Sequence, residues 1–169
     1  MLPVWKPALD ALTAARHGGQ IDHLASGLRD LDRRHPHVPE IVVELAFTLA
    51  SQGAHDEALA AYERALALGL PSPAEQANTL FGHAVCLLRL DRAADAVRAL
   101  EAARGQFPDH AEFAAALALA HHRAGATTEG LILLLGLLLE TGEDPGLAAH
   151  QRTLRSLLTP PAPSPVRRV

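Results

Sequence analysis

The feature that most constrains the fold of this chain is a short segment that recurs along it. Residues 53–59 (Gly-Ala-His-Asp-Glu-Ala-Leu) align with residues 19–25, 91–97 and 125–131, at separations of 34, 38 and 34 residues. Such a period is typical of proteins that repeat one supersecondary unit and bury the apolar side of each unit against the next. We therefore expect a stack of similar units.

The composition predicts that these units are helical. The chain has 33 Ala and 30 Leu, against only 19 Val, Ile and Thr together. Ala and Leu are strong helix formers, whereas the β-branched residues favour strands. The expected fold class is all-α, and a β-sandwich or barrel is excluded.

The prolines predict where the helices begin and end, because a proline inside a helix costs about 3 kcal/mol. The segment Ser72-Pro73-Ala74-Glu75 has the pattern of a helix start, with a capping serine and a glutamate three residues later. Asp109 with Glu112, and Asp144 before Pro145, offer similar starts. We expect helices at about residues 3–17, 20–34, 39–52, 55–69, 73–90, 92–106, 110–124, 127–141 and 145–158.

Small residues recur where two helices of a unit would cross. In the clearest copy these are Ala46, Ala58 and Ala65. Two antiparallel helices approach closely only where small side chains occupy the crossing. The sequence therefore predicts antiparallel hairpins at about residues 3–36, 39–72, 73–108 and 109–142, with a capping helix at 145–158, all in one domain of residues 1–158.

The copy from Pro39 to Leu70 resembles the tetratricopeptide repeat. The matching positions are Leu45-Ala46, Gly53, Ala58, Tyr62 and Ala65. The third copy departs from the pattern with Asp91 where glycine is usual, and the fourth departs with Gly130 and Leu137. The resemblance implies a right-handed solenoid of about four repeats that acts as a non-enzymatic protein-interaction module.

The second half of the chain is also similar to one bacterial family of tetratricopeptide-repeat proteins, which are built as a single compact solenoid without a catalytic domain. The similarity covers about residues 39–158 and rests on residues 107–122, 131–139 and 144–147. It implies a protein or peptide partner and self-association as a homodimer.

The resemblance also implies which residues line the concave face, since the first helix of each hairpin faces it. The residues at these positions form an apolar groove with a partly basic end: Val43, Phe47, Phe81, Val85, Leu88, Arg89, Leu119, His122 and Arg123. An apolar groove suits an amphipathic helix or an extended segment of a partner. The alternative for these side chains is ordinary packing between helices, because apolar stripes at helical spacing are usually core.

The segment from Leu131 to Leu139 is apolar on every side, so something must cover it. The helix expected at residues 145–158 can cover one side as a cap. If another side stays open, a second copy of the chain is the natural partner. The residues of this cap or dimer surface are Leu131, Leu135, Leu138, Leu139, Leu154 and Leu158.

The ten histidines raise the alternative of a small metal-binding protein or enzyme. The candidate ligands are His83 with Cys86, His35 with His37, and His121 with His122, but none repeats the paired spacing of a zinc site. We found no phosphate-binding loop or catalytic constellation in a convincing context. We therefore expect no cofactor and no enzymatic activity. A further alternative is a purely structural homodimer.

Charge and hydropathy limit the other partner classes. The net charge of −4 gives the chain no electrostatic reason to bind nucleic acid, and its longest apolar run is too short to cross a membrane. With one cysteine and no signal peptide at the start, we expect a cytoplasmic protein. Residues 159–169 are rich in proline and are expected to be a disordered tail.

Overall fold

The computed structural model of the chain describes residues 3–17 and 23–158, and within these ranges the regular structure is entirely helical. The helices are α1 (Lys6–His17), α2 (Leu24–Arg34), α3 (Pro39–Ser51), α4 (His55–Leu68), α5 (Pro73–Arg89), α6 (Ala93–Gln106), α7 (Ala111–Arg123), α8 (Thr127–Thr141) and α9 (Pro145–Leu158). The expected fold class is confirmed. The predicted tail, 159–169, lies outside the described residues.

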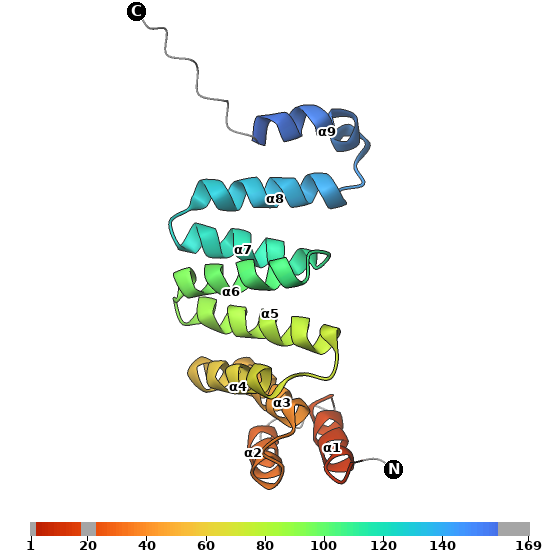
Figure 1. Cartoon of the computed structure of the whole chain (residues 1–169), viewed down its shortest axis with the longest axis vertical. Coiled ribbons are helices and arrows are strands. Elements are labelled where there is room, and N and C mark those ends of the chain that lie inside the picture. The colour runs from red at the N-terminus through yellow and green to blue at the C-terminus, as the bar shows by residue number, and fades with distance from the viewer. Residues whose placement is uncertain (1–2, 18–22, 159–169) are drawn as a thin grey trace, which may run out of the picture.

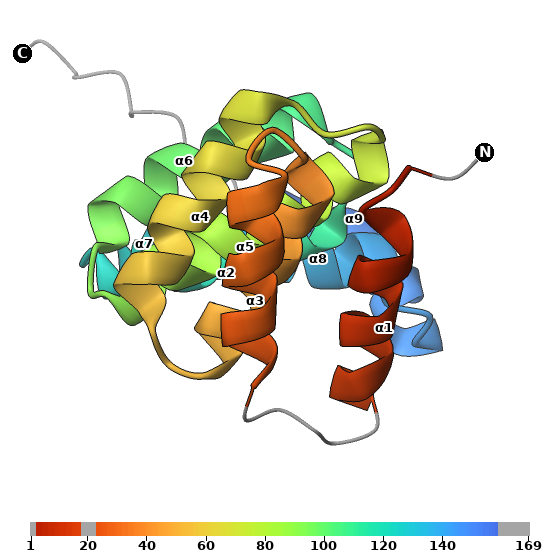
Figure 2. The same ribbon diagram turned by 90° about the horizontal axis from the view of Figure 1, so that it is seen from below.

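The helices follow one another along the long axis of the molecule in chain order (Figure 1). Successive helices pack against each other, and the first helix of one hairpin also contacts that of the next, as in α3 with α5 and α5 with α7. Seen from below, α1 stands to one side, apart from α2 and α3, which overlap in this view (Figure 2). The helices α1, α3 and α5 thereby come to border a common space.

The start of α5 follows the capping pattern that the sequence predicts. The backbone N–H of Glu75 donates to the Ser72 hydroxyl at 3.2 Å, and that hydroxyl donates to the Glu75 carboxylate at 2.8 Å. The start of α9 is also as expected, because the N–H of Leu147 donates to the Asp144 carboxylate at 2.9 Å. These side chains satisfy amide groups that have no partner within the helix.

The start of α7 differs from the expectation. The residue that precedes α7 is His110, and no side chain caps the helix there. The Glu112 carboxylate instead lies 2.7 Å from Nδ1 of His110, and this hydrogen bond lowers the pKa of Glu112. The sequence pattern predicts that Glu112 helps to cap the helix together with Asp109. In the structure the Glu112 carboxylate is instead bonded to the His110 ring.

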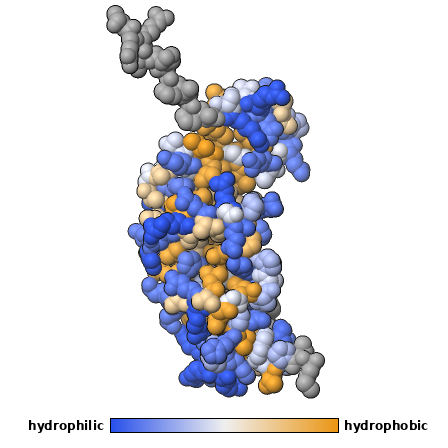
Figure 3. Space-filling view, viewed as in Figure 1, coloured by the Kyte–Doolittle hydropathy of each residue, from blue (hydrophilic) through white to orange (hydrophobic). Residues whose placement is uncertain are grey.

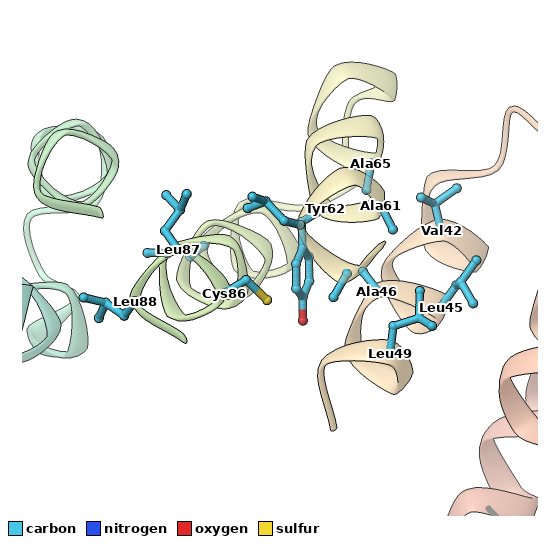
Figure 4. Close-up of a cluster of buried hydrophobic side chains, with 14 of the residues drawn as sticks. Val42, Leu45, Ala46, Leu49, Ala61, Tyr62, Ala65, Cys86, Leu87 and Leu88 are labelled. Carbon is cyan, nitrogen blue, oxygen red and sulfur yellow. The ribbon is translucent and has the colours of Figure 1, made fainter. Parts of the chain in front are cut away.

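The small residues lie at the helix crossings, as predicted. Ala46, Ala58 and Ala65 are fully buried in the core that α3 and α4 share. Tyr62 is buried as well, and its ring lies between α3 and the α5 helix that carries Cys86 (Figure 4). Burial raises the pKa of both the Tyr62 hydroxyl and the Cys86 thiol above their ordinary values, so both groups stay neutral.

Candidate functional site

A groove of about 1010 Å³ opens between α1, α3 and α5. Its size lies at the upper end of the range for ligand pockets, which leaves room for a segment of polypeptide. Single residues of α4 and of the α4–α5 loop complete it. The lining residues are Trp5, Lys6, Leu9, Asp10, Thr13, Glu40, Val43, Glu44, Phe47, Ala50, Ser51, Tyr62, Leu70, Glu75, Asn78, Phe81, Gly82 and Val85.

The floor of the groove is apolar, and two helices supply it. Val43 and Phe47 lie one turn apart on α3, and Phe81 and Val85 lie one turn apart on α5. A spacing of four residues places side chains on the same face of a helix. Phe47 is 53% exposed although it is large and apolar, whereas the other three are half-buried. The four residues therefore form one apolar surface, and Phe47 is its most exposed member.

The shape of the groove depends on Gly82, which is not among the predicted groove residues. A Cβ atom added at Gly82 would lie 2.6 Å from the ring and hydroxyl of Tyr62. The absence of a side chain therefore lets α5 approach the Tyr62 ring on α4. A glycine in a helix opposite the aromatic position of the preceding hairpin is the sequence signal for this contact.

The border of the groove is acidic. Four carboxylates line it, Asp10 from α1, Glu40 and Glu44 from α3, and Glu75 from α5, with Lys6 as the one lining cation among the described residues. The Lys6 ammonium donates to Asp10 at 2.5 Å. That hydrogen bond, together with the charges of Asp10, Glu40 and Glu44, raises the pKa of Lys6 above its ordinary value. The potential around the groove mouth is thus negative.

The structure places four of the nine predicted groove residues in this groove, namely Val43, Phe47, Phe81 and Val85. Leu88 lies instead in the core, where it is 6% exposed. Its carbonyl oxygen accepts a hydrogen bond of 2.8 Å from the Arg123 guanidinium, which ties α7 to the end of α5. Leu88 is therefore a core residue, and Arg123 joins two hairpins.

The remaining three predicted groove residues lie outside the lining of this groove. Arg89 is exposed at the end of α5, and Leu119 is exposed on α7. His122 is also exposed, with its Nδ1 atom 3.3 Å from the Thr127 hydroxyl oxygen. They do not join the apolar floor on α3 and α5.

The surface predicted to form a cap or a dimer lies on α8 and α9. Leu139 is buried, and Leu135, Leu154 and Leu158 are half-buried. The Gln151 side chain donates to the Leu139 carbonyl at 2.6 Å and holds α9 against α8. Leu131 and Leu138 are exposed, as are Ile132 and Leu134, which belong to the same apolar segment.

Leu131, Leu134 and Leu138 follow helical spacing along α8, and we refer to these three residues as the α8 stripe. Their exposed fractions are 55%, 51% and 47%. In the space-filling view apolar side chains gather along the middle of the face at the levels of α8 and α5 (Figure 3). The cap α9 therefore leaves a substantial part of α8 uncovered.

No group of three or more His, Cys, Asp or Glu that could hold a metal ion occurs within residues 3–17 and 23–158. His83 and Cys86 share a helix, but Cys86 is buried and Nε2 of His83 lies 3.5 Å from the Glu63 carboxylate. In the same described part of the chain, every helix is too short or too polar to span a membrane.

The comparisons with known proteins identify the repeat. The family model described as Tetratricopeptide repeat matches residues 25–73 and 81–149, which is more than half of the chain. The chain belongs to the tetratricopeptide repeat family. The first matched segment covers nearly all of α2 together with α3 and α4, so the family pattern extends into the degenerate first repeat. The second covers the latter part of α5, all of α6 to α8 and the start of α9.

Solved structures of MamA proteins share this tetratricopeptide-repeat fold. Residues 41 to the end of MamA from Desulfovibrio magneticus RS-1 match with a TM-score of 0.73 and 17% identity, over 91% of this chain and 88% of that one. MamA AMB-1 matches with a TM-score of 0.70 and 21% identity, over 84% and 76%. At these identities the likeness concerns the fold alone. A search of curated proteins finds no match.

Proposed function

We propose that this tetratricopeptide-repeat protein is a non-enzymatic scaffold that binds a segment of another protein in the groove between α1, α3 and α5. Membership of a repeat family of interaction modules supports the general role. The exposed Phe47 ring carries the specific proposal, because a large apolar side chain that faces solvent inside a groove gains free energy when a partner covers it.

The form of the groove favours a helical or extended segment. Its apolar floor runs along two neighbouring helices, and polar side chains surround that floor. An amphipathic helix can bury its apolar face in such a groove and keep its polar face in water. The side chains of Thr13, Ser51 and Asn78 in the lining offer hydrogen-bonding groups for the partner backbone.

Fluorescent amphipathic peptides test this proposal. We would titrate three peptides of equal length, whose apolar face is Leu and whose polar face is Lys, Gln or Glu, against wild type and Phe47→Ser. Covering a fully exposed apolar side chain contributes about 1.5–3 kcal/mol. Phe47 is about half exposed, so the loss of half of that free energy weakens binding by about four- to twelvefold. The measurement is fluorescence anisotropy of the peptide that binds best.

Leu157→Ser is the matched control, because Leu157 is 75% exposed on α9 and lies outside the groove lining. It should leave the affinity within about twofold of wild type, as surface substitutions usually do. Circular dichroism should show equal helix content for the three proteins. If none of the peptides binds, or if both substitutions weaken binding equally, the groove is not a binding site.

We further propose that the protein associates with a second copy of itself through the α8 stripe. The three leucines are about half exposed in a helix that is apolar from Leu131 to Leu139, which supports a partner for this face. In a two-fold symmetric dimer the same patch meets itself, and a stripe of leucines is complementary to its own copy.

A further inference from the structure

From the charge of the groove we infer what its partner looks like: a segment that carries Lys or Arg side chains beside its apolar residues. This inference rests on the proposed binding function, and it names the chemical class of the partner. The occupant is a segment of another protein, and an acidic segment is disfavoured.

The acidic residues of α3 lie beside the apolar floor in a fixed register. Glu40 and Glu44 are one turn apart, and each precedes a floor residue, Val43 or Phe47, by three positions. Side chains three and four residues apart are neighbours on a helix surface. A row of carboxylates therefore runs alongside the row of apolar side chains on α3.

The opposite walls of the groove add carboxylates. Glu75 projects from the first turn of α5, and Asp10 lies on α1. Lys6 is already hydrogen-bonded to Asp10, so it offsets one of the four charges. The Glu75 carboxylate accepts a hydrogen bond from the Ser72 hydroxyl, which carries no charge that could offset it. The groove thus retains an excess of negative charge on two sides of its floor.

Several carboxylates outside the groove are paired with an arginine within the chain. Asp32 pairs with Arg64, Glu57 pairs with Arg29, and Asp95 pairs with Arg92. By contrast, neither Glu40 nor Glu75 forms an ion pair with a described Lys or Arg. Glu40 and Glu75 are therefore placed to attract cations from a partner.

A segment with apolar and basic side chains matches both parts of this surface. Its apolar residues cover the floor while its Lys or Arg side chains reach the carboxylates at the border. Each exposed ion pair changes affinity by no more than about fivefold. Selectivity therefore arises from several pairs together, and it weakens as salt screens them.

The test compares two triple variants that change net charge equally. Glu40→Gln, Glu44→Gln and Glu75→Gln remove three groove charges, and glutamine can keep the capping arrangement with Ser72. The control combines Glu101→Gln, Glu129→Gln and Glu143→Gln, which are exposed and lie outside the groove lining. Both are titrated with the Leu/Lys, Leu/Gln and Leu/Glu peptides at low and high salt.

We expect wild type to bind the Leu/Lys peptide at least about tenfold more tightly than the Leu/Gln peptide at low salt, with the preference shrinking at high salt. The groove triple variant should lose most of that preference, while the control triple variant keeps it. Equal affinities for the three peptides in wild type, or an equal loss in both triple variants, would overturn the inference.

These outcomes are separable from failure of the binding proposal itself. If the Leu/Gln or Leu/Glu peptide binds best and Phe47→Ser weakens it, the groove binds segments but does not select basic ones. A peptide of residues 159–169, which contains Arg167 and Arg168 and no acidic side chain, is a fourth probe. If that peptide binds more tightly than the Leu/Lys peptide, the inference of an external partner is overturned, and the occupant of the groove is the chain's own segment 159–169.

Discussion

At the scale of single residues, the backbone at Asp91 shows how a repeat tolerates a departure from its pattern. Asp91 stands at the turn position that Gly53 and Gly125 occupy in the second and fourth hairpins. All three have positive φ angles, 58° for Asp91, 81° for Gly53 and 85° for Gly125. Asp is among the few residues with a side chain that enter this region, at a cost in free energy that glycine does not incur.

We expect Asp91→Gly to stabilise the protein by about 0.5 kcal/mol, because the relief of backbone strain outweighs the added freedom of the unfolded chain. The reciprocal change Gly53→Asp should destabilise it by about 1 kcal/mol. No atom would lie within 4 Å of a Cβ at Gly53, so the effect there comes from the backbone alone. Urea unfolding followed by circular dichroism measures both.

Asp109→Gly serves as the control, because Asp109 is exposed in a loop and does not have a positive φ angle. It should be neutral or slightly destabilising. A stabilisation equal to that of Asp91→Gly would show that the gain at position 91 does not come from the backbone angle.

At the scale of helices, two glycines in α8 differ in whether a side chain would fit at their position. A Cβ atom at Gly130 would lie 2.4 Å from the Ala118 carbonyl oxygen on α7, whereas a Cβ at Gly136 would meet nothing within 4 Å. Gly130 stands at the small-residue position of the fourth repeat, where Ala58 stands in the second. The missing methyl group lets α7 and α8 pack more closely than an alanine allows.

A glycine-to-alanine substitution should therefore change the free energy of unfolding in opposite directions at these two sites. Gly130→Ala is expected to destabilise the protein by about 1–3 kcal/mol, because backbone atoms must move to make room. Gly136→Ala should stabilise it by about 0.5–1 kcal/mol, because alanine is the better helix former. Thermal unfolding measures the difference, and a destabilisation by both would mean that α8 does not tolerate any added methyl group.

The hairpins could be predicted from the sequence because each depends on local signals. Prolines, the capping serine at Ser72 and the small residues Ala46 and Ala58 act within one helix or between neighbours. The groove could be predicted only in part. Val43 and Phe47 follow from their repeat positions, but Leu88 is covered because α7 packs on the end of α5, which no local pattern records.

The residues in and just before α1 that line the groove could not be predicted from the sequence either. Trp5, Leu9 and Asp10 line the groove, yet the first repeat is too degenerate for position matching. Their place depends on how α1, which packs against α2, comes to border the groove, and this is a property of the assembled stack. The acidic border likewise becomes visible only when residues of α1, α3 and α5 come together.

At the scale of the whole molecule, the α8 stripe predicts the oligomeric state. Leu131→Lys with Leu138→Lys places two charges where the proposed dimer is apolar, so the variant should be monomeric. The control is Ala60→Lys with Ala67→Lys, two exposed positions on α4 with the same spacing. Sedimentation equilibrium at micromolar concentration should show a dimer for wild type and control. A wild-type monomer would contradict the proposal.

The order of the helices in space follows the order of synthesis (Figure 1). Each helix finds its main contacts in the helix just before or just after it, so folding closes only short loops. Chains with such local contacts fold quickly, and a hairpin can form before the next has left the ribosome. The groove between α1, α3 and α5 is therefore complete while the last third of the chain is still being made.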